Sequence, residues 1–251
     1  MGVKKMRAVI SLLVGCAGLM LPATGSAEEA AITKLDDRSL EWQLARGGRI
    51  YDNWFAAQLA EPPLTYHPML PAGVDIEPAS SWRCVTCHGW DYRGGEMGGK
   101  AEEFNAPLPA RMAGKDADAI ARLLRAAPHS YDPSMLSEGA LGLVARFVVE
   151  GQHDIASYAD RQTGKAKGDP LEGRPVYQGV CISCHDSDGR AYIEGEPGDQ
   201  SSLGWLARNR PNQVLHKIRN GQPGTDMVQL RFLKDTQITN LLAYLQTLPD
   251  P

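Results

Sequence analysis

The chain has 251 residues, 22% of them charged, and a formal net charge of −4. This mildly acidic balance argues against nucleic acid as a partner and is compatible with docking onto a basic patch of another protein. Removal of a 27-residue leader would leave 224 residues (251 minus 27), enough for one large domain or two small ones.

The first 27 residues have the features of a secretory signal peptide. Basic residues precede an apolar run over 8–21, and the small residues Gly25-Ser26-Ala27 form an expected cleavage site. The run is too short to span a membrane. We therefore expect export to the periplasm. Leu13-Val14-Gly15-Cys16 also resembles a lipoprotein box, so membrane association would require lipidation of Cys16.

A short lead-in over residues 28–37 precedes the first expected helix, at residues 45–60. Gly47, Tyr51 and Phe55 recur there at every fourth position, which is typical of one face of a helix. A proline-rich insert then separates Phe55 from Cys84. Proline lacks a backbone donor and interrupts helices, so we expect this insert to be an extended loop around the domain.

The chain contains a reactive pattern twice, in which two cysteines three positions apart are followed by a histidine. Its copies are Cys84-Val85-Thr86-Cys87-His88 and Cys181-Ile182-Ser183-Cys184-His185. Two thiols three positions apart can each add to one vinyl group of a haem, and the adjacent His can ligate the iron. The pattern therefore predicts two covalently bound haem c groups. A zinc knuckle would not need a His after each pair, and a thioredoxin-like site would occur once, in a βαβ context.

The elements that follow each motif occur in the same order. The aromatic residues Trp90 and Tyr92 and a glycine-rich stretch over 94–99 follow the first motif and would wrap its haem. The stretches 119–125 and 213–219 align without a gap. We predict two tandem domains, with residues 28–150 as the first, 151–167 as a polar linker and 168–251 as the second. The further expected helices are 116–127, 137–150, 173–181, 203–208, 211–220 and 235–248.

Over residues 40–250 this arrangement resembles a duplicated class I cytochrome c. The resemblance implies an all-α fold in which each domain surrounds one haem. It also implies that His88 and His185 are the proximal iron ligands and that a residue of each late loop is the distal ligand. The family's contact between first and last helices is matched by Gly47, Tyr51 and Phe147 in the first domain, and by Gly173, Tyr177 and Tyr244 in the second.

Met227 is the expected distal ligand of the second iron. It lies six positions before Leu233, where the family carries its ligand methionine, although Val228 replaces the usual proline after it. A methionine in such a loop could instead fill a gap in the core. His216 is the fallback, but it lies within an expected helix.

The first domain departs from this pattern, because Ser130 occupies the position equivalent to Met227. We expect the adjacent His129 to ligate the first iron. Its alternative interpretation is an exposed loop histidine. Several other residues are weaker candidates for this ligand: Met135, Met97, Met112, His153, and the insert residues His67 and Met69, for which surface or packing roles are favoured.

With two protein ligands on each iron, no catalytic residue is expected and the remaining chemistry is one-electron transfer between redox partner proteins. The donor would be a dehydrogenase or a quinol-linked complex. Methionine ligation raises the reduction potential of a haem, so the second haem should have the higher potential. Two alternatives stay open: a peroxidase-like enzyme with an open site on the first haem, and the cytochrome subunit of a periplasmic oxidoreductase complex.

Overall fold

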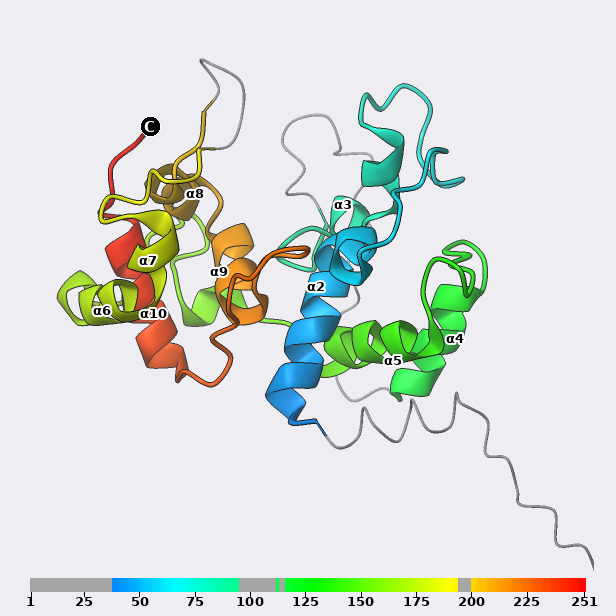
Figure 1. Ribbon diagram of the computed structural model, residues 1–251, viewed down its shortest axis with the longest axis horizontal. Coiled ribbons are helices and arrows are strands. Elements are labelled where there is room, and N and C mark those ends of the chain that lie inside the picture. The colour runs from blue at the N-terminus through cyan, green and yellow to red at the C-terminus, as the bar shows by residue number, and fades with distance from the viewer. Residues whose placement is uncertain (1–37, 95–111, 113–115, 194–199) are drawn as a thin grey trace, which may run out of the picture.

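The computed structural model describes residues 38–94, 112, 116–193 and 200–251, and these ranges form helices and loops without a strand (Figure 1). The predicted all-α class is confirmed for them. No helix in these ranges has both the length and the apolar character needed to cross a membrane. The helices are α2 (Leu40–Gln58), α3 (Cys84–His88), α4 (Ala117–Arg125), α5 (Glu138–Arg146), α6 (Pro170–Val176), α7 (Ile182–His185), α8 (Leu203–Asn209), α9 (Pro211–Asn220) and α10 (Asp235–Leu245).

The described residues also contain shorter helical segments. They are the 3-10 helices η1 (Pro78–Trp82) and η5 (Ile155–Ser157), and the π-helices η4 (Phe147–Gly151) and η6 (Tyr177–Cys181). The proline-rich insert is otherwise irregular, as predicted. Several expectations fall outside the described residues: the signal peptide 1–27 with Cys16, the lead-in 28–37, most of the glycine-rich stretch, and Met97.

Side-chain caps set the helix starts. The Asp116 carboxylate accepts from the Asp118 N–H at the start of α4, and the Ser137 hydroxyl accepts from the Ala140 N–H at the start of α5. Helix α2 is interrupted at Asn53, whose φ of −155° is not helical. The Asn53 amide oxygen accepts from the Ala56 N–H and so begins the following turn. The single helix expected at 45–60 is therefore kinked.

The buried side chains form two hydrophobic clusters. The first contains residues between Ile50 and Val148, and the second contains residues between Ile155 and Leu248. In Figure 1, α2–α5 lie on one side of the molecule and α6–α10 on the other, and α9 packs against α2 where the two parts meet. We call residues 38–151 the first half and residues 152–251 the second half.

The first and last helices pack together in each half, as the sequence predicted. A Cβ atom on Gly47 would lie 2.2 Å from the Leu143 carbonyl oxygen, and one on Gly173 would lie 2.0 Å from the Asn240 carbonyl oxygen. Only glycine permits so close an approach of two backbones. Beside these glycines, the Tyr51 and Phe147 ring centroids are 5.4 Å apart. The equivalent Tyr177 and Tyr244 centroids are 5.3 Å apart.

Residues 151–167, the predicted polar linker, are partly built into the second half. Ile155, Tyr158 and Ala159 are buried and belong to the second hydrophobic cluster. An isolated β-bridge joins Ala159 to Ala166. The exposed lysines give the segment a polar composition, but its short apolar face packs on the second half.

Candidate haem-binding sites

The first motif forms α3, and the residue before it is tightly bound. The Arg83 guanidinium donates to the Asp52 carbonyl oxygen and to the Asp52 carboxylate, both at 2.7 Å. After the motif, the chain turns away at Gly89, whose φ is 72°. The buried Tyr51 hydroxyl donates to the Gly89 carbonyl at 2.7 Å. Helix α2 therefore fixes both ends of the motif.

The second motif is also helical, and the chain turns in the same way after its histidine. It spans the end of η6 and α7, which continue directly from α6. The chain turns away at Asp186, whose φ is 58°, a left-handed conformation that L residues rarely adopt. The Tyr177 hydroxyl donates to the Asp186 carbonyl at 2.6 Å. In both halves, a tyrosine from the helical segment that opens the half donates to the carbonyl of the residue that follows the motif histidine.

No disulfide joins the four motif cysteines, all of which lie within the described residues. Burial raises the pKa of Cys84 to about 12, and that of Cys87 and Cys181 to about 11, so these thiols are protonated at neutral pH. Cys84 packs against the first cluster and Cys181 against the second, so the two pairs stand apart. The described residues contain no group of three or more His, Cys, Asp or Glu that could hold a metal ion. Because the two cysteine pairs pack against different clusters, they do not come together as the four ligands of a zinc knuckle.

The structure brings His129 next to His88. The two rings lie within 28° of parallel, and their centroids are 6.1 Å apart. His129 Nδ1 is buried and makes no hydrogen bond. Such an orphaned polar atom, beside a motif histidine, fits a site that also contains a haem iron.

His129 is half-buried, so its alternative interpretation as an exposed loop histidine is wrong. Burial lowers its pKa, the neighbouring His67 lowers it further, and the Leu123 carbonyl has a smaller opposing effect. A neutral imidazole is the form that binds metals. His67 supports this loop, because its Nε2 lies 3.2 Å from the His129 carbonyl and its ring packs against Trp82 with centroids 4.5 Å apart.

Four of the weaker candidates for the first iron have other surroundings than His129. Met135 and Met112 pack against the first cluster. Met69 is 57% exposed. His153 is buried, and its Nδ1 lies 3.1 Å from the Tyr92 hydroxyl. Each of these side chains therefore has a packing or hydrogen-bonding role of its own or points to solvent.

In the second half, burial lowers the pKa of His185, which again favours the neutral imidazole. Its ring packs against Tyr192 with centroids 5.6 Å apart. Met227 is half-buried in the loop between α9 and α10. Its ligation of the same iron as His185 stays a prediction.

The fallback ligand, His216, is engaged with the first half instead. Its Nε2 lies 2.9 Å from the Gly48 carbonyl oxygen, and its Nδ1 lies 3.0 Å from the Tyr92 hydroxyl. A carbonyl only accepts, so Nε2 carries the proton and Nδ1 accepts from Tyr92. Tyr92 then accepts from the Nδ1–H of His153. With both ring nitrogens bonded to protein, His216 is unsuited to bind iron.

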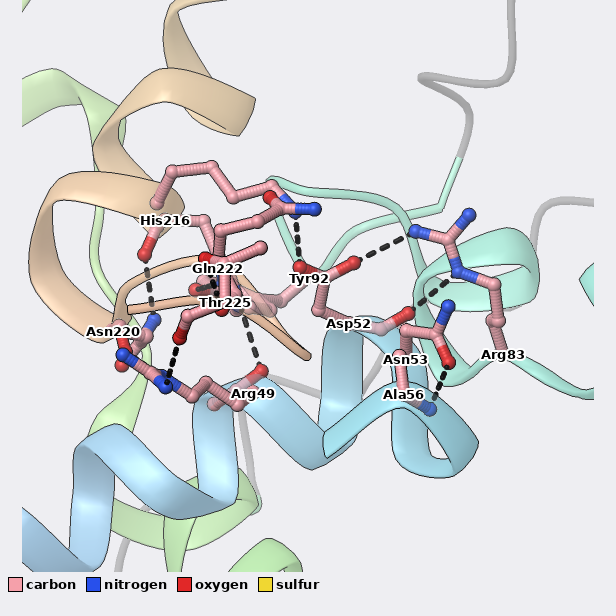
Figure 2. A network of polar contacts seen from close by, with 12 residues as sticks. Arg49, Asp52, Asn53, Ala56, Arg83, Tyr92, His216, Asn220, Gln222 and Thr225 are labelled. Carbon is pink, nitrogen blue, oxygen red and sulfur yellow. Dashed lines mark hydrogen bonds and ion pairs between the residues drawn. The ribbon is translucent and has the colours of Figure 1, made fainter. Parts of the chain in front are cut away.

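Sequence reasoning missed a buried ion cluster that supports the first motif. Asp52 is 1% exposed and pairs with both Arg83 and Lys217, the latter from α9 of the second half (Figure 2). The Lys217 ammonium also lies 4.9 Å from the centre of the Trp90 ring. An acidic residue next to Tyr51, on the buried face of an expected helix, was the available signal.

Comparison with family models matches residues 171–249 to the family described as Cytochrome c. Comparison with the curated proteins and with the solved structures finds no match. The matched segment begins in α6 and ends after α10, so it contains the second motif and Met227. Residues 171–249 are therefore a cytochrome c domain, which implies a covalently bound haem c with iron and a role in electron transfer.

Proposed function

We propose that this chain is an exported diheme cytochrome c, in which the first half is a second cytochrome c domain. The observation that carries the proposal is the repetition, in the first half, of the geometry of the matched domain. A tyrosine of the first helix donates to the carbonyl after the motif histidine in both halves, from Tyr51 to Gly89 and from Tyr177 to Asp186. The accepting residue has a positive φ in both.

Two further correspondences support the same conclusion. Gly47 and Gly173 occupy equivalent close approaches between first and last helices. An arginine at the end of a middle helix pairs with an acid at the start of the last helix in both halves, Arg125 with Glu138 and Arg219 with Asp235. Such agreement over distant positions indicates a common fold rather than a chance recurrence of one short motif.

The proposed ligands are His88 and His129 for the first iron, and His185 and Met227 for the second. A bound haem c supplies an iron that accepts and returns one electron. The chain attaches the group through its cysteines, orients it with two side chains and excludes water with buried aromatic residues around the motif. Methionine ligation raises the potential, so electrons would pass from the first half to the second.

The haem content of the purified protein tests the proposal. We expect two covalently attached haems per chain by intact mass and by quantitative haem absorbance. The double variant Cys84→Ala/Cys87→Ala should retain one haem, and so should Cys181→Ala/Cys184→Ala. A wild-type chain with one haem, lost only in the second double variant, would reduce the proposal to the matched domain.

The proposed location is the periplasm. The proposed partners are redox proteins whose basic patches dock on the acidic surface of this chain. N-terminal sequencing of the exported protein should begin after Ala27. A lipid-modified N-terminus at Cys16 would instead place the protein on a membrane.

The spectrum of the wild-type protein separates an electron carrier from the peroxidase-like alternative. Two fully ligated irons should give a low-spin ferric spectrum and no rapid binding of carbon monoxide after reduction. A high-spin ferric signal would favour the enzyme. Stable co-purification with a dehydrogenase or oxidase would favour the role of a subunit in an oxidoreductase complex.

A further inference from the structure

The loop that carries Met227 is bound by an arginine of the first half. In α2, Arg49 Nε donates to the Asn220 carbonyl at 2.8 Å, Nη1 donates to the Thr225 carbonyl at 3.3 Å, and Nη2 donates to the Met227 carbonyl. Figure 2 shows this guanidinium reaching from α2 to the end of α9 and the loop beyond it. Three separate nitrogens of one side chain therefore contact three points of the loop.

The loop backbone fits closely around this guanidinium. Gly221 has a φ of 81°, and a Cβ atom there would lie 2.2 Å from Arg49 Nη2 and 2.5 Å from the Met227 carbonyl oxygen. On the other side of the loop, a Cβ atom on Gly224 would lie 3.4 Å from the Ala56 carbonyl oxygen of α2. The loop thus rests on the first half at more than one point.

The middle of the loop has little support from its own structure. Gly224, Thr225 and Asp226 are exposed. The loop's internal bonds are long, from the Met227 N–H to the Thr225 hydroxyl at 3.3 Å and from the Thr225 hydroxyl to the Gln222 carbonyl at 3.1 Å. Exposed loops with few buried contacts open at low free-energy cost. An external contact to the Met227 backbone therefore has a large effect on where its side chain can lie.

We propose that Arg49 is a positioning residue for Met227, so that methionine ligation of the second iron depends on the first half of the chain. This inference rests on the proposed diheme function. Arginine suits the task because its rigid planar fork donates in several directions at once, whereas a lysine ammonium is a compact point charge. Charge-assisted hydrogen bonds to backbone carbonyls are also stronger than neutral ones.

The test compares three variants of the full-length holoprotein: Arg49→Gln, Arg49→Lys and Arg46→Gln. Arg46 is the matched control, since it lies one turn earlier in α2 and donates to the Ala57 carbonyl of its own half at 3.2 Å. The readouts are the charge-transfer band of methionine-ligated ferric haem and the affinity of the ferric protein for added imidazole. Imidazole competes with the methionine for the iron.

Both Arg49 variants should weaken the methionine band and raise imidazole affinity by about tenfold, the equivalent of one such hydrogen bond. The Arg46 variant should match wild type. Wild-type behaviour in both Arg49 variants would overturn the inference. Wild-type behaviour in Arg49→Lys alone would also overturn it, because the effect would then come from charge and not from position. If Arg49→Gln does not accumulate with two haems, Arg49→Lys carries the test.

Failure of the proposed ligation gives a different result. If the wild-type protein lacks the methionine band, or if Met227→Leu leaves it unchanged, the ligand assignment is wrong whatever Arg49 does. If the band is present and disappears in Met227→Leu but not in the Arg49 variants, only the positioning role is wrong.

Discussion

The imidazole rings of His88 and His129 lie nearly parallel, with 6.1 Å between their centroids. In the proposed diheme protein, we therefore expect His129→Ala to convert the first haem from low-spin to high-spin and to allow carbon monoxide to bind after reduction. Absorbance and electron paramagnetic resonance spectra measure both effects. Met135→Leu is the control and should leave the spectra unchanged. A spectral change in the Met135 variant, with none in His129→Ala, would transfer the ligand role to Met135.

Replacement of Met227 by His should keep the second haem low-spin and lower its potential. Thioether ligation favours the reduced iron more than imidazole does, and axial ligands set haem potentials over a range of about 0.8 V. We expect a fall on the order of 0.1 V in one of the two steps of a redox titration. The other step should not move, and a shift in both would contradict separate ligand sets.

Gly173→Ala should destabilise the second half. Its new methyl group would meet the Asn240 carbonyl oxygen of α10 at 2.0 Å. Overpacking of this kind costs about 1–3 kcal/mol in the free energy of unfolding, measured by urea denaturation. Gly142→Ala is the matched control, because nothing lies within 4 Å of its Cβ position in α5. That change should instead stabilise by about 0.5–1 kcal/mol, and equal effects of the two changes would argue against the close helix contact.

Asp52→Asn should destabilise the protein by about 3–5 kcal/mol, because it leaves two cations beside an interior site without their counter-charge. The control is Asp154→Asn, which removes an exposed partner of Arg161 and should cost no more than about 1 kcal/mol. Urea denaturation of the holoproteins compares the two. Similar small effects in both variants would mean that water reaches the Asp52 site.

Stability should fall as the pH drops below about 6.5, the ordinary pKa of histidine. Burial first, then the charges of His216 and Arg219, lower the pKa of His153 to about 3, and burial lowers that of His216 well below its usual value. Between the lowered pKa of each folded histidine and its ordinary value, the unfolded chain binds a proton that the folded chain does not. Each histidine therefore lowers the free energy of unfolding by about 1.4 kcal/mol for every pH unit lost. For His153 the effect is complete near pH 3, and for both histidines it is absent above the ordinary value.

Urea titrations across this pH range measure the slope. His153→Gln should have a shallower slope than wild type, because the unfolded variant has one fewer group to protonate. An unchanged slope in this variant would show that the acid sensitivity arises elsewhere.

Local features of this fold could be predicted from sequence, whereas contacts between its halves could not. The caps Asp116 and Ser137 and the glycines at the helix contacts follow from rules that act within a few residues or within a repeat. His216 looked like a possible ligand because nothing in its own helix revealed Tyr92 as its partner. Partners that are distant in the chain and lie in loops have no periodic signature.

A chain of hydrogen bonds runs from His153 through Tyr92 to His216 and the Gly48 carbonyl, and its donors and acceptors can be arranged in one way. Any rotation of one half against the other would break these buried bonds together with the Lys217–Asp52 pair. In the proposed diheme protein, the gap between the irons would then be the same in every molecule. Electron exchange across it should follow a single exponential rather than a spread of rates.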